Sequence, residues 1–157
     1  MKEHLATEEM THLATLPTWP KANAEFTVQF KVKVILPIPY FQTVLLFRPD
    51  SYPQGRLPSF HLNDQGKIHA FFRCDSTNDQ GLVGRWQDIT PGIYHQISLK
   101  QELDTEKKFR VKFYINGVRK GLCVNTIPGE VYNNVKILVA ESVNNAIYFI
   151  KDLDYFF

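Results

Sequence analysis

The chain has 157 residues, of which 44% are hydrophobic and 13% aromatic, and it carries a net charge of +2 at pH 7. That length fits a single domain, residues 1–157, which can bury enough surface to fold without a metal. The small net charge excludes the dominant basic face that nucleic-acid binding requires, and no stretch approaches the ~20 apolar residues of a membrane span.

The N-terminal segment carries charges that interrupt its apolar residues, among them Lys2, Glu3 and Glu8. It therefore lacks the continuous apolar stretch of a signal peptide, and the chain is either cytosolic or the mature part of a secreted protein. We interpret residues 1–18 as an N-terminal arm, in which residues 3–13 could form one or two helical turns.

Alternation of apolar and polar residues predicts the first strand at residues 25–34. Pro37 and Pro39 end it, because proline lacks a backbone donor. A second strand is expected at residues 41–47, followed by an exposed loop at residues 48–58. The predicted core face of the first strand consists of Phe26, Val28, Phe30, Val32 and Val34.

Residues 57–62 and 67–74 flank the turn formers Asn63-Asp64-Gln65-Gly66, which predicts a hairpin. A second loop region is expected at residues 75–90. If the hairpin loop holds two or four residues, His61 and His69 lie on opposite faces of the sheet, and only a one-residue slip brings them together.

Four further strands follow, at residues 94–99, 109–115, 118–123 and 135–139, and a last one at residues 147–156. Asn116-Gly117 predicts a tight turn, residues 101–107 a polar turn and residues 125–133 a loop. Many short strands with one apolar face each require two sheets that cover each other. The expected fold is therefore an all-β, two-sheet antiparallel β-sandwich, a jelly roll.

Residues 90–157 resemble the C-terminal half of laminin G-like and concanavalin A-like jelly-roll domains. Pro91-Gly92-Ile93-Tyr94-His95-Gln96-Ile97 is similar to the family's G-x-W-H-x-V strand, with Tyr94 in place of Trp, and Phe113-Tyr114-Ile115-Asn116-Gly117-Val118 to its hydrophobic-Tyr-hydrophobic-Asp-Gly hairpin. Residues 128–140 and 150–155 resemble the closing strand pair. The resemblance implies this fold and a glycan or an extracellular protein as the ligand. The galectin signature is absent.

Loops at one rim of such a sandwich are the expected binding site. The rings of Trp86, Tyr52 and Tyr132 could stack on sugar faces, although Trp86 is as well explained as a buried ring under a loop. The polar residues expected beside these rings are Arg48, Arg56 and Asn125. These residues belong to the loops at 48–58, 75–90 and 125–133.

Calcium is the one cofactor that the residues suggest. Asp75, Asn78, Asp79 and Asp88 place oxygen donors in one loop region, and hard oxygen ligands suit Ca²⁺. The alternative is that these residues simply form turns through their own backbone hydrogen bonds.

Glu102, Asp104 and Glu106 have the spacing of the E-x-D-x-E strand of jelly-roll glucanases, where paired carboxylates cleave glycosidic bonds. The run continues into Lys107 and Lys108 without a further apolar anchor, so we interpret it as a solvated turn. His95 is expected to orient a strand or a loop.

Two groups of basic residues, Lys31 with Lys33 and Lys108 with Arg110 and Lys112, would form a basic stripe for sulfated or sialylated glycans if their strands are neighbours. The alternative is that these lysines are exposed only to prevent the edges of two sheets from pairing.

The cysteines, Cys74 and Cys123, are either free thiols or one long-range disulfide.

The sequence thus favours a non-catalytic, lectin-like carbohydrate-binding domain that is secreted. Alternatives are an adhesive protein-interaction domain without a sugar site and a glycoside-active enzyme that uses Glu102 and Glu106. A homodimer formed through an edge strand is also compatible with the sequence.

Overall fold

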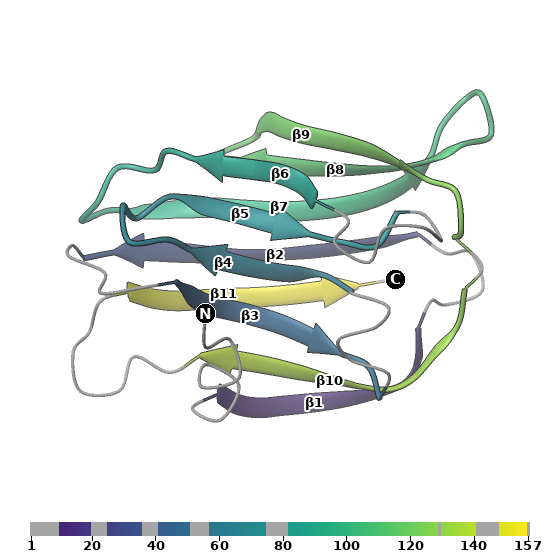
Figure 1. Ribbon diagram of the computed structural model, residues 1–157, viewed down its shortest axis with the longest axis horizontal. Helices are drawn as coiled ribbons and strands as arrows, with labels where there is room; N and C mark the ends of the chain where they lie inside the picture. Colours follow the sequence, from purple (N-terminus) through teal and green to yellow (C-terminus); the bar gives the residue numbers. More distant parts are fainter. Residues whose placement is uncertain are drawn as a thin grey trace.

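The computed structural model describes residues 10–19, 25–35, 41–50, 57–74, 82–128, 130–140 and 148–156. These residues form eleven strands in two antiparallel sheets (Figure 1), which confirms the predicted two-sheet β-sandwich. They contain no helix, and so no helix that could span a membrane.

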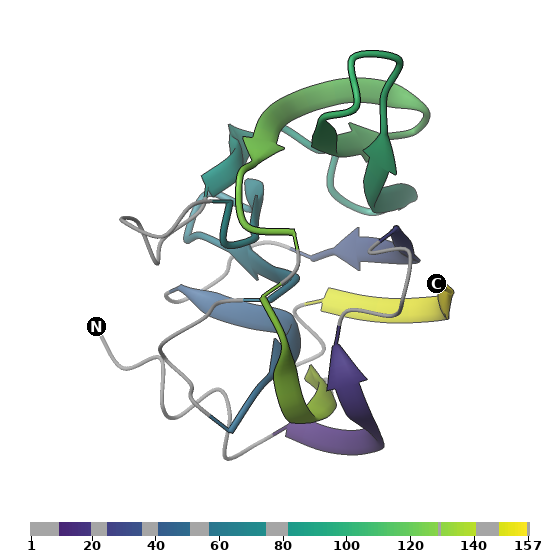
Figure 2. The ribbon, with the colours of Figure 1, turned by 90° about the vertical axis from the view of Figure 1, so that its right-hand side faces the viewer.

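The six-stranded sheet has the order β1-β10-β3-β4-β5-β6 and the five-stranded sheet the order β11-β2-β7-β8-β9. Figure 2 shows the two layers from the side, with β3 of the first sheet and β2 and β11 of the second on opposite sides of the molecule. The strands of the first sheet are β1 (Met10–Trp19), β10 (Tyr132–Ala140), β3 (Gln42–Arg48), β4 (Ser59–Leu62), β5 (Ile68–Phe71) and β6 (Leu82–Gln87). Those of the second are β11 (Tyr148–Phe156), β2 (Phe26–Val34), β7 (Tyr94–Leu103), β8 (Phe109–Ile115) and β9 (Val118–Asn125).

The core lies between the inner faces of the two sheets. Strand β2 alternates strictly between buried and half-buried residues, as its sequence predicts. Phe30 of β2 meets Phe60 of β4 edge to face, with ring centroids 4.9 Å apart. Phe60 in turn approaches Phe113 of β8 at 6.5 Å. These rings join the two sheets, because each comes from an inward position of its own strand.

Several boundaries differ from the sequence prediction. Residues 10–19 form edge strand β1 beside β10, so the helical turns expected at residues 3–13 are wrong for residues 10–13, and residues 10–18 of the expected arm belong to this strand. Strand β6 occupies part of the loop expected at 75–90. Strand β7 runs to Leu103, so the polar turn is shorter than expected and spans only residues 104–107.

The prediction for the two histidines of the β4–β5 hairpin is wrong. His61 pairs directly with His69, and the two rings lie on one face with centroids 5.1 Å apart. The physical reason is the Asn63 side chain, whose carbonyl accepts hydrogen bonds from the backbone N–H groups of Gln65 and Lys67. This Asx turn gives the loop five residues, whereas the prediction assumed two or four. An odd number of loop residues places His61 directly opposite His69, so both side chains lie on the same face of the sheet.

Cys74 and Cys123 form a disulfide with a Cα–Cα distance of 6.7 Å, which resolves the alternative that the sequence left open. The bond joins the segment after β5 in one sheet to β9 in the other.

His95 has the orienting role expected for it: its Nε2–H donates to the Thr90 carbonyl, and its Nδ1 accepts from the Asn116 side-chain amide.

Candidate functional site

A small pocket opens at the rim of the sandwich, where the ends of β1, β7 and β9 meet the start of β10 and the segment after β5. Its enclosed volume is about 10 Å³, the space of a single water molecule or hydroxyl group. The polar residues that line it are Arg73, Gln101, Asn125, Glu130 and Tyr132, and the Trp19 ring contributes to its wall. Two predicted site residues, Asn125 and Tyr132, therefore come together here.

A buried amide pair forms one wall of this rim pocket. The Asn125 Nδ2 donates to Gln101 Oε1 over 2.7 Å, and the Asn125 Oδ1 accepts from the backbone N–H of Ile127. Both side chains are buried, and a buried polar group is stable only when it is hydrogen-bonded. The pair therefore fixes the end of β9 against β7 and sets the direction in which the chain leaves the sheet.

An arginine, a glutamate and a tyrosine also line the pocket and contact one another. The Arg73 Nη1 donates to Glu130 Oε1 over 2.9 Å and to the Tyr132 hydroxyl over 3.4 Å. Burial raises the pKa of Tyr132 to about 12, and the negative charge of Glu130 acts in the same direction. The phenol is therefore protonated at neutral pH, so it can both donate and accept a hydrogen bond.

Local contacts hold Arg73 in this position although it lies outside a strand. Its neighbour Cys74 forms the disulfide with Cys123 of β9. The carbonyl of Cys74 also accepts hydrogen bonds from the backbone N–H and the hydroxyl of Thr126. The Arg73 side chain is only 16% exposed, and its guanidinium donates to Glu130 and Tyr132 at the pocket.

This arrangement suits the chemistry of a sugar edge. A hydroxyl group both donates and accepts hydrogen bonds, and two adjacent hydroxyls can bind a cationic donor and an anionic acceptor at once. Arg73 and Glu130 present these two groups side by side. Because the enclosed space admits only one hydroxyl group, the rest of any ligand would lie across the mouth.

Trp86 lies elsewhere, on the outward face of the six-stranded sheet. Its ring stacks on His69 with centroids 3.5 Å apart, and the edge of Phe41 contacts it at 5.8 Å. His61 completes the group through hydrogen bonds with the hydroxyls of Thr43 and Ser59. Trp86 is thus half-buried in an aromatic cluster and is not part of the rim pocket.

Other predicted site residues do not join the pocket. Arg48 is exposed at the end of β3, and Asp88 is exposed and pairs with Lys67 over 3.4 Å. Tyr52, Arg56, Asp75, Asn78 and Asp79 lie outside the described residues. Within the described ranges no group of three or more His, Cys, Asp and Glu side chains could hold a metal ion, and the calcium site stays a prediction.

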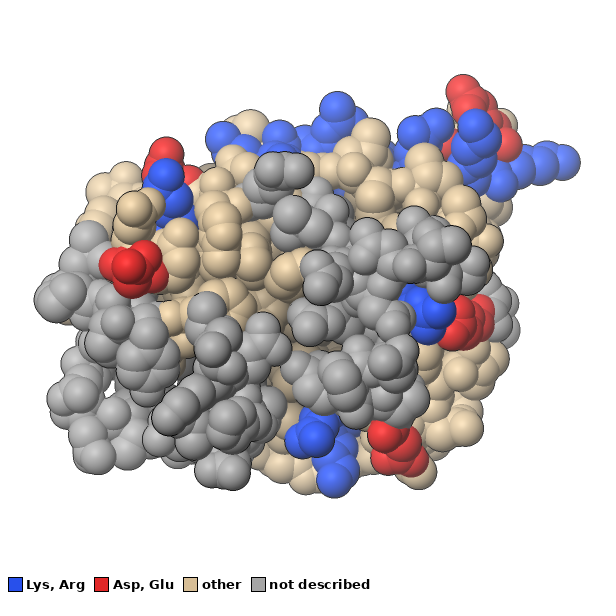
Figure 3. All heavy atoms as spheres, viewed as in Figure 1, with Lys and Arg blue, Asp and Glu red and all other residues tan. Residues whose placement is uncertain are grey.

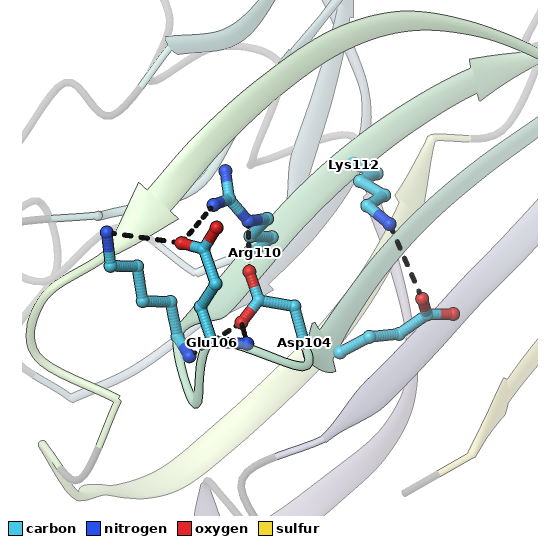
Figure 4. Close-up of polar contacts among 6 residues, drawn as sticks. Asp104, Glu106, Arg110 and Lys112 are labelled. Carbon is cyan, nitrogen blue, oxygen red and sulfur yellow. Dashed lines mark hydrogen bonds and ion pairs between the residues drawn. The ribbon is translucent and has the colours of Figure 1, made fainter.

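The acidic segment of the proposed glucanase motif forms ion pairs (Figure 4). Glu102 lies 3.7 Å from Lys112, and Arg110 contacts both Asp104 and Glu106. The hydrogen bond from Arg110 is the main cause that lowers the pKa of Asp104. An ionised Asp104 and an exposed Glu106 at a hairpin turn match the expected solvated turn.

Sequence reasoning missed Arg73, Gln101 and Glu130. No local pattern distinguishes these residues, because they come from three parts of the chain: Arg73 follows β5, Gln101 lies in β7 and Glu130 precedes β10. The signal that could have pointed to Arg73 is its position next to Cys74, since a disulfide to Cys123 would place it near Asn125.

The two packed antiparallel sheets define the class of protein as an all-β, jelly-roll-like sandwich. No protein-family model and no curated protein matches the sequence. Solved structures share the fold. Endo-β-1,4-glucuronan lyase from Trichoderma reesei is 9% identical, with a TM-score of 0.61 over 93% of this chain and 74% of the lyase chain.

Two further similar structures are the heptameric SAP-like pentraxin from Limulus polyphemus and the CBM40 of Ruminococcus gnavus IT-sialidase bound to α2,3-sialyllactose. The pentraxin is 15% identical, with a TM-score of 0.54 over 92% of this chain and 67% of its own. The CBM40 is 14% identical, with a TM-score of 0.53 over 83% of this chain and 77% of its own. At these identities the likeness shows the fold alone.

Proposed function

We propose that the protein is a non-catalytic carbohydrate-binding domain of the laminin G-like or concanavalin A-like type, with its sugar site at the rim pocket. The observation that carries the proposal is the contact of Arg73 with both Glu130 and Tyr132 around a space the size of one hydroxyl. The CBM40 bound to α2,3-sialyllactose, one of the similar structures, supports a glycan as the ligand.

A secreted setting is part of this proposal. The Cys74–Cys123 disulfide supports it, because such bonds persist in oxidising compartments and are rare in the cytosol. The ion pairs of Glu102 with Lys112 and of Glu106 with Arg110 support a binding role over glycoside cleavage, because a carboxylate held by a basic side chain is less available as an acid or a nucleophile.

A glycan array, followed by titration calorimetry with the best ligand, tests the proposal. Arg73→Gln and Tyr132→Phe should each weaken binding about tenfold, because each removes a hydrogen bond that involves a charged group. Arg48→Gln and Tyr94→Phe make the same chemical changes outside the pocket and should leave the affinity within about twofold. Running the array with calcium and with a chelator tests the calcium prediction in the same experiment.

Three outcomes would overturn the proposal. Silence on all glycans together with binding to a matrix protein would favour the protein-interaction alternative. Unchanged affinity in Arg73→Gln would place the sugar site elsewhere. Release of reducing sugar from a bound glycan, lost in Glu106→Gln, would show a glycosidase.

A further inference from the structure

Positive charge is concentrated in one short part of the chain. Residues 100–120 contain seven Lys and Arg residues and three acidic ones, a net charge of +4, whereas the whole chain carries +2. The rest of the chain is therefore net negative, at −2. Residues 100–120 run from the end of β7 through β8 into β9, so this charge lies on three neighbouring strands of the five-stranded sheet, from its central strand β7 to its edge strand β9.

The three acidic residues of this segment are already matched by basic ones. Glu102 pairs with Lys112 over 3.7 Å, and Arg110 contacts Asp104 and Glu106 (Figure 4). Lys108 adds a second contact to Glu106 at 3.5 Å. Three acids and three bases thus neutralise one another.

Four cations of the same segment remain, which we call the basic edge: Lys100, Lys107, Arg119 and Lys120. None of the acidic side chains in the described part of the chain forms an ion pair with them. Figure 3 shows Lys and Arg atoms along the margin of the molecule where β8 and β9 lie. Asp and Glu atoms also lie at this margin (Figure 3), but the net charge of the segment is positive, and a net positive surface attracts and orients anions.

Three cations of the basic edge lie near the Tyr114 end of β8, and the fourth lies near its other end. The Lys100 ammonium lies over the Tyr114 ring, 5.7 Å from its centroid, and Arg119 pairs directly opposite Tyr114 in the β8–β9 ladder. Lys120 follows Arg119 and is exposed. Lys107 lies in the turn at the other end of β8, about 20 Å away at the rise of a strand.

Apolar surface accompanies these charges. Leu122 and Val124 of β9 are 40% and 36% exposed, and the Tyr114 ring lies between Lys100 and Arg119. Sugar rings carry apolar C–H faces beside their anionic groups, so rings and aliphatic side chains between cations suit an acidic sugar chain. A ligand that reaches both ends of the edge must be extended.

We propose that the basic edge binds a linear anionic polysaccharide that carries sulfate or carboxylate groups, lying along β8 and β9. This site is separate from the rim pocket and does not depend on the function proposed for it. A nucleic acid fits less well, because the net charge of the chain outside the segment is negative and would repel a longer phosphate backbone.

Retention on immobilised heparin, eluted by a salt gradient, tests this inference. The triple variant K100Q/R119Q/K120Q should elute at much lower salt and bind heparin at least tenfold more weakly. The control K31Q/K67Q/K136Q removes the same charge from β2, the β4–β5 loop and β10, and should bind within about twofold of the wild type. Heparin oligosaccharides too short to span the edge should bind more weakly than long ones.

Equal losses in the two triple variants would show a non-specific charge effect and overturn the site. If double-stranded DNA or polyglutamate binds more tightly than heparin, the basic edge belongs to another class of polyanion and the proposal is wrong. R73Q should retain full heparin binding, because Arg73 lies in the rim pocket. The glycan titration therefore tests the proposal for the rim pocket, and heparin retention tests the proposal for the basic edge. Circular dichroism of each variant checks that it is folded.

Discussion

Gly84 in β6 lies against the ring of Phe113 in β8, so close that a Cβ at Gly84 would come within 2.1 Å of the Phe113 Cδ2. The missing side chain lets this ring fill the space between the two sheets. Gly84→Ala should therefore lower the free energy of unfolding by about 1–3 kcal/mol through overpacking. Urea denaturation measures the change.

The double variant Gly84→Ala/Phe113→Leu tests whether the contact is the cause. Removing the ring should make the added methyl group much less harmful than it is in the single variant, so the two effects should not add. Additive losses would contradict the assigned contact.

The disulfide between Cys74 and Cys123 closes a loop with a sequence separation of 49 residues. In the chain-entropy model a loop of this length corresponds to about 4 kcal/mol of stabilisation. Replacing both cysteines by alanine should lower the free energy of unfolding by this order, while the β-sheet circular dichroism spectrum persists. Complete loss of structure would show that the core between the sheets is too small to fold alone.

Asp104 should make stability depend on acid pH. Because the Arg110 hydrogen bond lowers its pKa from the ordinary 3.8, its contribution is present above that value and is lost as the pH falls through the lowered pKa. Asp104→Asn should therefore have a lower melting temperature than the wild type at pH 7, and the difference should vanish in strong acid. A difference that is constant with pH would exclude this ion pair as the cause.

Tyr132 should titrate above the ordinary pKa of a tyrosine side chain. Burial raises its pKa to about 12 from the ordinary 10.0, so the stability linked to its neutral form is present below pH 10 and is lost as the pH rises through about 12. The difference in phenolate absorbance between the wild type and Tyr132→Phe should have its midpoint near 12. A midpoint near 10 would show that the hydroxyl is solvated.

Strand positions could be predicted because alternation is a local property. Phe26 to Val34 alternate without a break, and burial on one face of β2 follows directly. The register of β4 and β5 could not be predicted, because it depends on one hydrogen-bonding choice by Asn63, which adds a residue to the loop. That single residue moves His61 and His69 onto the same face.

The candidate site was only half predictable for a related reason. Asn125 and Tyr132 flank a loop that the sequence marks clearly, so both were expected at the rim. Their partners are distant in sequence, because Arg73 follows β5 and Gln101 lies in β7, and only the completed sandwich brings them together. Trp86 was assigned to a loop because irregular pairing of β5 with β6 hides the strand that carries it.

The position of the disulfide also determines where the sandwich can open. Cys74 and Cys123 join the two layers at the rim that carries the Arg73 pocket, whereas the opposite ends of the same strands have no covalent tie among the described residues. Separation of the layers should therefore begin away from the pocket. In hydrogen-exchange measurements, the amides of β5 and β9 nearest the bond should be the slowest to exchange in their strands, because the bond keeps the rim around the Arg73 pocket intact during partial opening.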